Sequence, residues 1–124
     1  MLASPLNDHL KIRAEELDGG RVRLSMDAGP EWLNEVGLLH GGLMALLIDG
    51  AGGRAAVRTL ALGERCATVH LSVQYLKAGR AGRITAEAWI VQRGRRIAFL
   101  EGECRGEDGT VLARATGTWS ILAA

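Results

Sequence analysis

The chain has 124 residues, and 48% of them are hydrophobic, which is ample for one packed core. Its 15 basic and 14 acidic residues leave a formal net charge of +1, so no broad positive surface for nucleic acid or anionic lipid is expected. We therefore predict one domain over residues 1–124 that binds no nucleic acid and no membrane, and that meets an anionic ligand through a local basic cluster.

Cysteine usage and the amino-terminal sequence bear on the cell compartment. Cys66 and Cys104 lack the spacing of a metal site, and a chain that builds a core needs no disulfide framework. Residues 1–17 show no basic start followed by an apolar run. The most apolar stretch, residues 43–48, is too short to cross a bilayer. These features predict a soluble cytoplasmic protein with free thiols.

The first elements follow from hydrophobic periodicity. Apolar and polar side chains alternate over residues 10–14 and again over residues 22–26, which is typical of strands. Asp18-Gly19-Gly20 predicts a hairpin turn between them. Residues 28–39 predict a loop with a short helical turn. From His40 to about Leu60, residues rich in Leu, Ala and Met without proline predict one long helix.

The strand period returns after Gly63 in four segments, near residues 68–75, 84–90, 98–104 and 111–121. Glycine-containing turns separate them at residues 79–82, 93–95 and 108–109. Consecutive strands joined by short turns favour an antiparallel sheet, and one long helix covers one face of it most economically. The sequence thus predicts the α+β class.

Small residues interrupt the long helix. Each of Gly50, Gly52 and Gly53 costs up to about 1 kcal/mol relative to alanine, so close packing should compensate. Six positions at spacings of three and four form a stripe that we expect to approach another backbone: Gly42, Ala45, Asp49, Gly52, Gly53 and Ala56.

Asp49 is the lone acid in this helix. Its neighbours three and four residues away are Leu46, Ala45, Gly52 and Gly53, none of which can pair with it. A carboxylate in apolar surroundings is costly unless something pairs with it or uses it. A solvent-facing aspartate without a role is the alternative interpretation.

The residues His40-Gly41-Gly42 begin the helix. The first amide groups of a helix have no internal partners, so they can receive a developing negative oxygen, and glycine lets a carbonyl come close. For His40 alone we prefer a structural role in holding the loop. Asn34 is equally consistent with a turn residue and with an amide aimed at the same carbonyl.

Asn34, Gly37, His40-Gly41-Gly42 and Asp49, followed by Thr68 on a strand and by VQYLKAGRAGRITAEAWIVQRGRRIAFLEGE, resemble the hotdog-fold acyl-CoA thioesterases of the phenylacetate-degradation (PaaI-like) type. The resemblance covers roughly residues 22–122. It implies a hotdog fold, in which an antiparallel β-sheet wraps around one long central helix. It also implies hydrolysis of an aryl- or medium-chain acyl-CoA to the free acid and CoA, without a metal or cofactor.

The resemblance also implies roles for individual residues. Asp49 looks like the general base or nucleophile, and Gly41 like the backbone donor to the thioester oxygen. Asn34 and His40 would arrange that end of the site, and Thr68 would help to place the attacking water. Gly50 and Gly53 depart from the family, because relatives commonly carry hydroxyl residues there, so Thr68 is the main hydroxyl candidate.

Spacing along the helix bears on assembly. His40 and Asp49 are nine residues apart, roughly 13 Å along the axis, so one thioester carbon cannot contact both. If both act in one reaction, a two-fold dimer is the simplest arrangement. A second interface, or a partly covered sheet face, is expected at Trp89, Val91, Ile97 and Phe99, and a dimer of dimers would use it.

Binding of the CoA phosphates is expected at basic groups near turns, because the guanidinium fork suits phosphate. A solvated hairpin tip is an equally good interpretation of the QRGRR segment. The candidates for substrate and CoA binding are Gly42, Lys77, Arg80, Arg93, Arg95 and Arg96.

Two alternative functions stay open. A hotdog dehydratase or hydratase would pair a histidine with a carboxylate to move protons on carbon, and a cross-dimer pair of His40 and Asp49 would allow this. A non-catalytic acyl-CoA-binding domain is the other. The retained acid at Asp49 favours turnover.

Overall fold

The computed structural model describes residues 4–123, so the domain predicted over residues 1–124 includes four residues that lie outside it. All six predicted strands and the long helix are present. In chain order the elements are α1 (Pro5–Leu10), β1 (Arg13–Glu16), η1 (Asp18–Gly20), β2 (Val22–Ala28), η2 (Pro30–Trp32), α2 (Gly41–Val57), β3 (Arg65–Tyr75), β4 (Gly82–Arg93), β5 (Ile97–Arg105) and β6 (Val111–Leu122).

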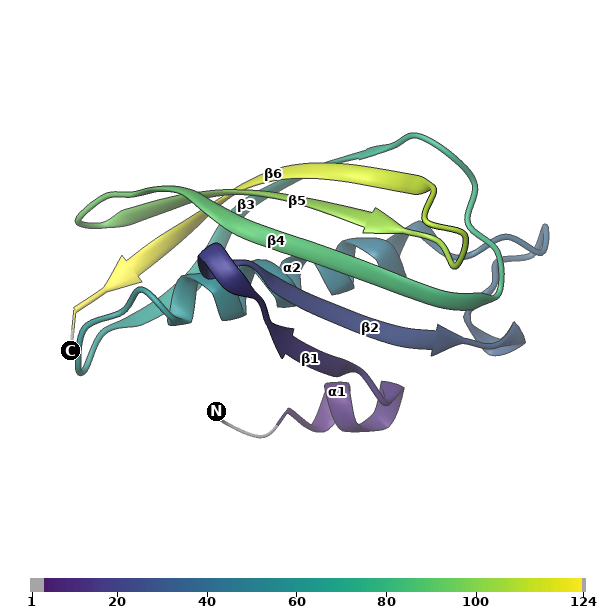
Figure 1. Cartoon of the computed structure of the whole chain (residues 1–124), viewed down its shortest axis with the longest axis horizontal. Coiled ribbons are helices and arrows are strands. Elements are labelled where there is room, and N and C mark those ends of the chain that lie inside the picture. The colour runs from purple at the N-terminus through teal and green to yellow at the C-terminus, as the bar shows by residue number, and fades with distance from the viewer. Residues whose placement is uncertain (1–3, 124) are drawn as a thin grey trace.

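The strands form one antiparallel sheet in the order β1-β2-β4-β5-β6-β3. The sheet curls around α2, which runs beneath it, while α1 lies beyond β1 (Figure 1). This is the hotdog fold that the sequence resemblance implied. Since β3 is the last strand in the order, its second edge pairs with no other strand of the described chain.

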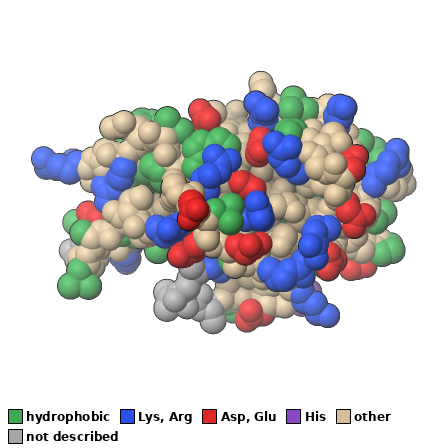
Figure 2. Space-filling view, viewed as in Figure 1, with side chains coloured by type: hydrophobic (Ala, Val, Ile, Leu, Met, Phe, Trp, Pro, Cys, Tyr) green, Lys and Arg blue, Asp and Glu red, His purple; other side chains and the backbone are tan. Residues whose placement is uncertain are grey.

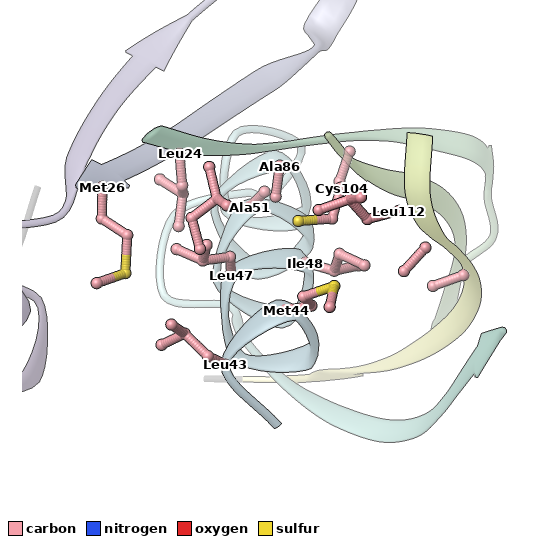
Figure 3. Packing of buried hydrophobic residues seen from close by; sticks show 14 of the residues in the cluster. Leu24, Met26, Leu43, Met44, Leu47, Ile48, Ala51, Ala86, Cys104 and Leu112 are labelled. Carbon is pink, nitrogen blue, oxygen red and sulfur yellow. The ribbon is translucent and has the colours of Figure 1, made fainter. Parts of the chain in front are cut away.

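The core lies between α2 and the concave face of the sheet. Leu47, Ile48 and Ala51 of α2 are fully buried against alternating side chains of the strands (Figure 3). Their partners include Leu24 on β2 and Cys104 on β5. Burial raises the pKa of the Cys104 thiol to about 12, because the thiolate would be desolvated. Cys66 and Cys104 are both free thiols, as predicted.

The small residues of α2 do not all face the same way. A Cβ on Gly52 would lie 2.9 Å from Leu100 Cδ2 and 3.1 Å from Trp119 Cη2, so glycine is what lets the helix approach the sheet closely. Ala56 is also fully buried in this chain. The close approach predicted for the stripe is thus made at Gly52 to the chain's own sheet, and Ala56 packs in the same core, so these two positions face inward.

The amino-terminal prediction is partly wrong. Leu10 ends helix α1 instead of beginning a strand, and Lys11 with φ 56° terminates that helix. Ser4 caps it by accepting a hydrogen bond from the Asn7 N–H at 3.2 Å. β1 begins only at Arg13, and all four of its residues are exposed. The alternation over residues 10–14 thus spans a helix end and an edge strand.

Charged side chains of both signs are interspersed over the face shown in Figure 2. On the convex side of the sheet, Glu87 accepts hydrogen bonds from Arg23 at 2.9 Å and from Arg21 at 3.3 Å. None of the helices described for this chain has the length and hydropathy needed to span a bilayer.

Candidate active site

Asp49 lies in the third turn of α2 and faces the edge strand β3. Its Oδ1 accepts a hydrogen bond from the Thr68 hydroxyl at 2.8 Å. Among the described residues, no other side chain or backbone amide donates to this carboxylate, which leaves Oδ2 open. The sequence predicted apolar surroundings for Asp49. In the single chain Asp49 is only half-buried, and Thr68 is exposed. The structure thus brings together two of the residues predicted for catalysis.

An open cleft of about 590 Å³ surrounds this pair, between α1, α2 and β3. Its walls are mostly apolar, and the residues that contribute to it include Leu6, Leu46, Val57, Cys66 and Trp119. Gly50 and Gly53 border the same cleft. The carboxylate therefore sits at the wall of a cavity that suits an apolar group.

The other end of the predicted site is the start of α2. His40 is its N-cap, and its Nδ1 accepts a hydrogen bond from the Gly42 N–H at 3.1 Å. The Leu43 N–H donates to the His40 carbonyl. His40 thus caps the helix, and the Gly41 N–H has no acceptor within the described chain.

Tyr75 is a site residue that sequence analysis missed. Its hydroxyl donates to the Gly41 carbonyl oxygen at 2.9 Å, and a Cβ on Gly41 would lie 3.1 Å from Tyr75 Cε1. The ring therefore fixes the start of α2 and explains why the position is glycine. The available signal was that this is the single tyrosine of the chain, at the end of an alternating strand.

Asn34 holds the loop before α2. Its Oδ1 accepts from the N–H groups of Val36 and Leu38, both at 3.1 Å, and Gly37 adopts φ 80° within the same turn. Asn34 nevertheless borders a hollow of about 300 Å³ together with Gly41, Tyr75 and Lys77. The turn role is observed, and the residue also lies beside the Gly41 amide.

The predicted basic residues divide between the β3–β4 loop and the β4–β5 hairpin, and these two segments lie at opposite ends of the molecule (Figure 1). Lys77 and Arg80 lie in the β3–β4 loop and border one hollow of about 550 Å³. Arg95 and Arg96 are exposed in the β4–β5 hairpin. Arg93 binds Glu64 at 2.8 Å and Thr59 at 3.2 Å, so its guanidinium already ties the hairpin to the segment after α2.

These positions limit which groups can share one ligand. Lys77 borders both the hollow beside Gly41 and the hollow that contains Arg80, so a continuous surface joins the helix start to these two cations.

Over the described residues, no group of three or more His, Cys, Asp or Glu side chains is placed to hold a metal ion.

Comparison with known proteins decides the family. A family model described as the thioesterase superfamily matches residues 36–113, which is more than half of the chain. The chain belongs to the thioesterase superfamily. The matched segment contains both the start of α2 and Asp49 with Thr68.

This thioesterase is similar to the medium/long-chain acyl-CoA thioesterase YigI of Salmonella typhimurium, with 28% identity covering 94% of this chain and 85% of the relative. It is also similar to the BH2602 protein from Bacillus halodurans, solved with CoA, at 30% identity and a TM-score of 0.90, covering 98% and 81% of the two chains. A mutant of the thioesterase PA1618 from Pseudomonas aeruginosa has 27% identity and a TM-score of 0.89, covering 96% and 86%. The chain is accordingly a thioester hydrolase with a hotdog fold.

Proposed function

We propose that this thioesterase hydrolyses an aryl- or medium-chain acyl-CoA to the free acid and CoA, as one hotdog domain over residues 1–124 that works as a dimer. The observation that carries the proposal is the Asp49 carboxylate, held by Thr68 at the wall of an apolar cleft. The name of YigI and the CoA in the BH2602 structure support the substrate class.

The chemistry uses the open oxygen of Asp49. As a general base, Oδ2 takes a proton from a water molecule while the water oxygen bonds to the thioester carbon and CoA leaves as the thiolate. As a nucleophile, Oδ2 attacks that carbon itself, the thiolate leaves, and water then hydrolyses the mixed anhydride. In both routes the hydrogen bond from Thr68 to Oδ1 holds the carboxylate so that Oδ2 faces the substrate.

The Gly41 amide is our candidate for the donor to the thioester oxygen. It is the backbone N–H at the start of α2 that has no acceptor within residues 4–123, and one such donor contributes about 3 kcal/mol in comparable acyl transfers.

The hydrogen bonding of His40 supports a hydrolase over a dehydratase. Because its Nδ1 already accepts from Gly42, a neutral ring carries its hydrogen on Nε2 and has no lone pair left to remove a proton from carbon.

The free edge of β3 supports a shared site. An exposed strand of 11 residues with an unpaired edge is a template for a second strand, and its Val69 is 65% exposed. If two β3 strands pair antiparallel about an axis at Ser72, Leu71 lies opposite Val73 of the partner subunit, and the extra residue of the β3 bulge at Val69 sets Thr68 opposite the partner's Tyr75. Thr68 is bonded to Asp49 and Tyr75 to Gly41, so this pairing brings the carboxylate toward the partner's Gly41.

The CoA moiety would then leave the thioester along the hollows beside Gly41. Lys77 and Arg80 offer cations for its phosphates on that path, whereas Arg93 is already paired with Glu64. Arg95 and Arg96 remain candidates from the opposite end of the fold. Exposed Val91, Ile97 and Phe99 form an apolar area on the convex face, where we place the contact for a dimer of dimers.

Release of free thiol tests the reaction. Wild-type protein should release CoA from a panel of benzoyl-, phenylacetyl- and medium-chain acyl-CoAs, and Asp49→Asn should lower kcat at least about 100-fold. Asp18→Asn, an exposed aspartate in η1, is the matched control and should not change the rate. Formation of an unsaturated acyl-CoA without thiol would indicate the dehydratase, and tight binding without turnover would indicate a binding domain. Either result contradicts the proposal.

Mixed subunits test the shared site. Gly41→Pro removes the amide hydrogen at the first helical position, where the proline backbone fits, and Gly41→Ala controls for the contact that an added Cβ makes with the Tyr75 ring at 3.1 Å. In a mixture of Asp49→Asn and Gly41→Pro subunits, each heterodimer keeps one intact site. We expect about a quarter of wild-type activity from equal amounts of two inactive proteins. A mixture as inactive as its components would contradict the shared site.

A further inference from the structure

The indole of Trp119 lies at the floor of the Asp49 cleft. Trp119 is 1% exposed, and it sits on β6 directly opposite Thr68 of β3. A Cβ built on Gly52 would lie 3.2 Å from Trp119 Cζ2, whereas one on Gly53 would lie 3.6 Å from Nε1. The ring therefore turns its carbon edge to Gly52 and its N–H edge to Gly53.

The Nε1 hydrogen of Trp119 is not used by the protein. No oxygen or nitrogen atom of residues 4–123 accepts a hydrogen bond from it, although the side chain is almost completely buried. Gly53 and Trp119 both border the cleft that contains Asp49. Indole nitrogen can only donate, so the matching ligand group is an acceptor.

We propose that the acyl group of the substrate carries a hydrogen-bond acceptor, such as an ether, keto or hydroxyl oxygen, that binds the Trp119 N–H through the gap left by Gly53. This inference rests on the proposed function, because it assigns the acyl group to the cleft beside Asp49. Apolar pockets commonly gain specificity from one such polar group.

The helix gives an approximate position for the acceptor. Gly53 is one turn beyond Asp49, about 6 Å along the axis. The reacting carbon must lie next to the Asp49 carboxylate, so the acceptor should be about that far along the acyl chain. The larger apolar side chains of the cleft include Leu46, Val57 and Cys66, which suit an aliphatic or aromatic body of the acyl group. Ser4, Asn7 and Arg54 add polar groups to the same cleft.

Gly53 controls access to the indole. Its missing side chain leaves Nε1 open to the cleft, and a methyl group there would be in ordinary van der Waals contact with the nitrogen at 3.6 Å. Gly53→Ala therefore blocks the N–H without forcing any atom to move. Trp119→Phe removes the N–H and keeps an aromatic ring.

An oxygen scan tests the proposal. Octanoyl-CoA is compared with octanoyl-CoAs in which an ether oxygen replaces each methylene from C3 to C7 in turn, and kcat/KM is measured for each. Wild-type protein should favour one oxygen position by about tenfold over its neighbours, the ratio that one hydrogen bond of about 1 kcal/mol or slightly more produces. Trp119→Phe and Gly53→Ala should each lose this preference. Trp89→Phe, the same change on the convex face, is the matched control and should keep it.

Three results would overturn the proposal: no preferred position in the wild type, a preference that survives in both variants, or an equal loss of kcat for every substrate in Trp119→Phe. If Trp119→Phe does not fold, Gly53→Ala decides alone. If the wild type hydrolyses none of these thioesters, the proposed function fails. Calorimetric binding of the corresponding free acids then decides the inference, since Trp119-dependent tightening at one oxygen position supports it and its absence contradicts it.

Discussion

The hydroxyl of Tyr75 and the carbonyl oxygen of Gly41 are 2.9 Å apart, so the end of β3 is bonded to the first residue of α2. The amide of the same residue, Gly41, is our candidate for the oxyanion donor. The edge strand thereby sets the position of that donor, and the same strand holds Asp49 through Thr68. Both halves of the site depend on β3.

Tyr75→Phe should separate positioning from folding. Loss of one hydrogen bond is expected to lower the free energy of unfolding by about 1 kcal/mol. The helix start then loses its tether, so kcat/KM should fall by about tenfold because small displacements of an oxyanion donor are costly. Kinetics and thermal unfolding measure the two effects. Wild-type kinetics in a destabilised variant would show that the tether does not position the amide.

Thr68 offers a conservative pair of substitutions. Thr68→Ala removes the donor to Asp49 Oδ1, and kcat should fall about 10- to 100-fold because hydrogen bonds to charged groups are strong. Thr68→Ser keeps the hydroxyl and should retain most of the activity. Steady-state kinetics with one acyl-CoA check this. Equal losses in both variants would point to the threonine methyl group instead.

Two neighbouring glycines of α2 should respond in opposite ways to alanine. At Gly52 the new Cβ meets Leu100 and Trp119 at 2.9 and 3.1 Å, so Gly52→Ala should lower the free energy of unfolding by about 1–3 kcal/mol. At Gly53 the contact is an ordinary 3.6 Å, and Gly53→Ala should raise stability by up to about 1 kcal/mol through helix propensity. Denaturant unfolding of both proteins checks the signs. Equal shifts would contradict this packing.

Glu87 predicts a pH effect on stability. Partial burial opposes its ionisation, but hydrogen bonds and charges from Arg23 and Arg21 outweigh burial and hold the pKa of this carboxyl below its usual range. A lowered pKa in the folded state stabilises the protein above the unfolded pKa, and the contribution is lost as the pH falls through the folded value.

The wild type should therefore exceed Glu87→Gln in free energy of unfolding by up to about 1 kcal/mol at neutral pH, since the pair is partly exposed. This difference should fade below about pH 4. Urea unfolding at a series of pH values measures it. A difference that grows on acidification has the wrong sign for these ion pairs.

Sequence patterns predicted the elements that bury one face. Strands such as β2 and β6 alternate because every second residue contacts α2, and the helix signal of residues 41–57 is long and free of proline. Helix α1 was not predicted because it has six residues, of which only Leu10 is buried. Its Ser4 cap and Pro5 were visible in the sequence, but a single turn and a half carries too little periodicity to outweigh the strand pattern beside it.

The candidate site could be predicted only at positions where the residue type itself indicates a chemical role. Asp49 was visible because nothing near it in sequence could pair with it, and the resemblance named Thr68. Tyr75 and Trp119 were missed because their partners, Gly41 and Gly53, are more than 30 residues away and are defined by register between strands and helix. The direction of Gly52 was missed for the same reason, because one helical stripe can divide between core and cleft.

Gly41 and Asp49 occupy one uninterrupted helix, and eight residue steps separate them. Inserting or deleting a single residue in this interval would rotate everything beyond it by about 100° and turn the carboxylate away from Thr68. The β5–β6 turn around Asp108 and Gly109 has no such constraint. Insertions and deletions should therefore be tolerated at that turn, whereas the number of residues between Gly41 and Asp49 cannot change without loss of activity.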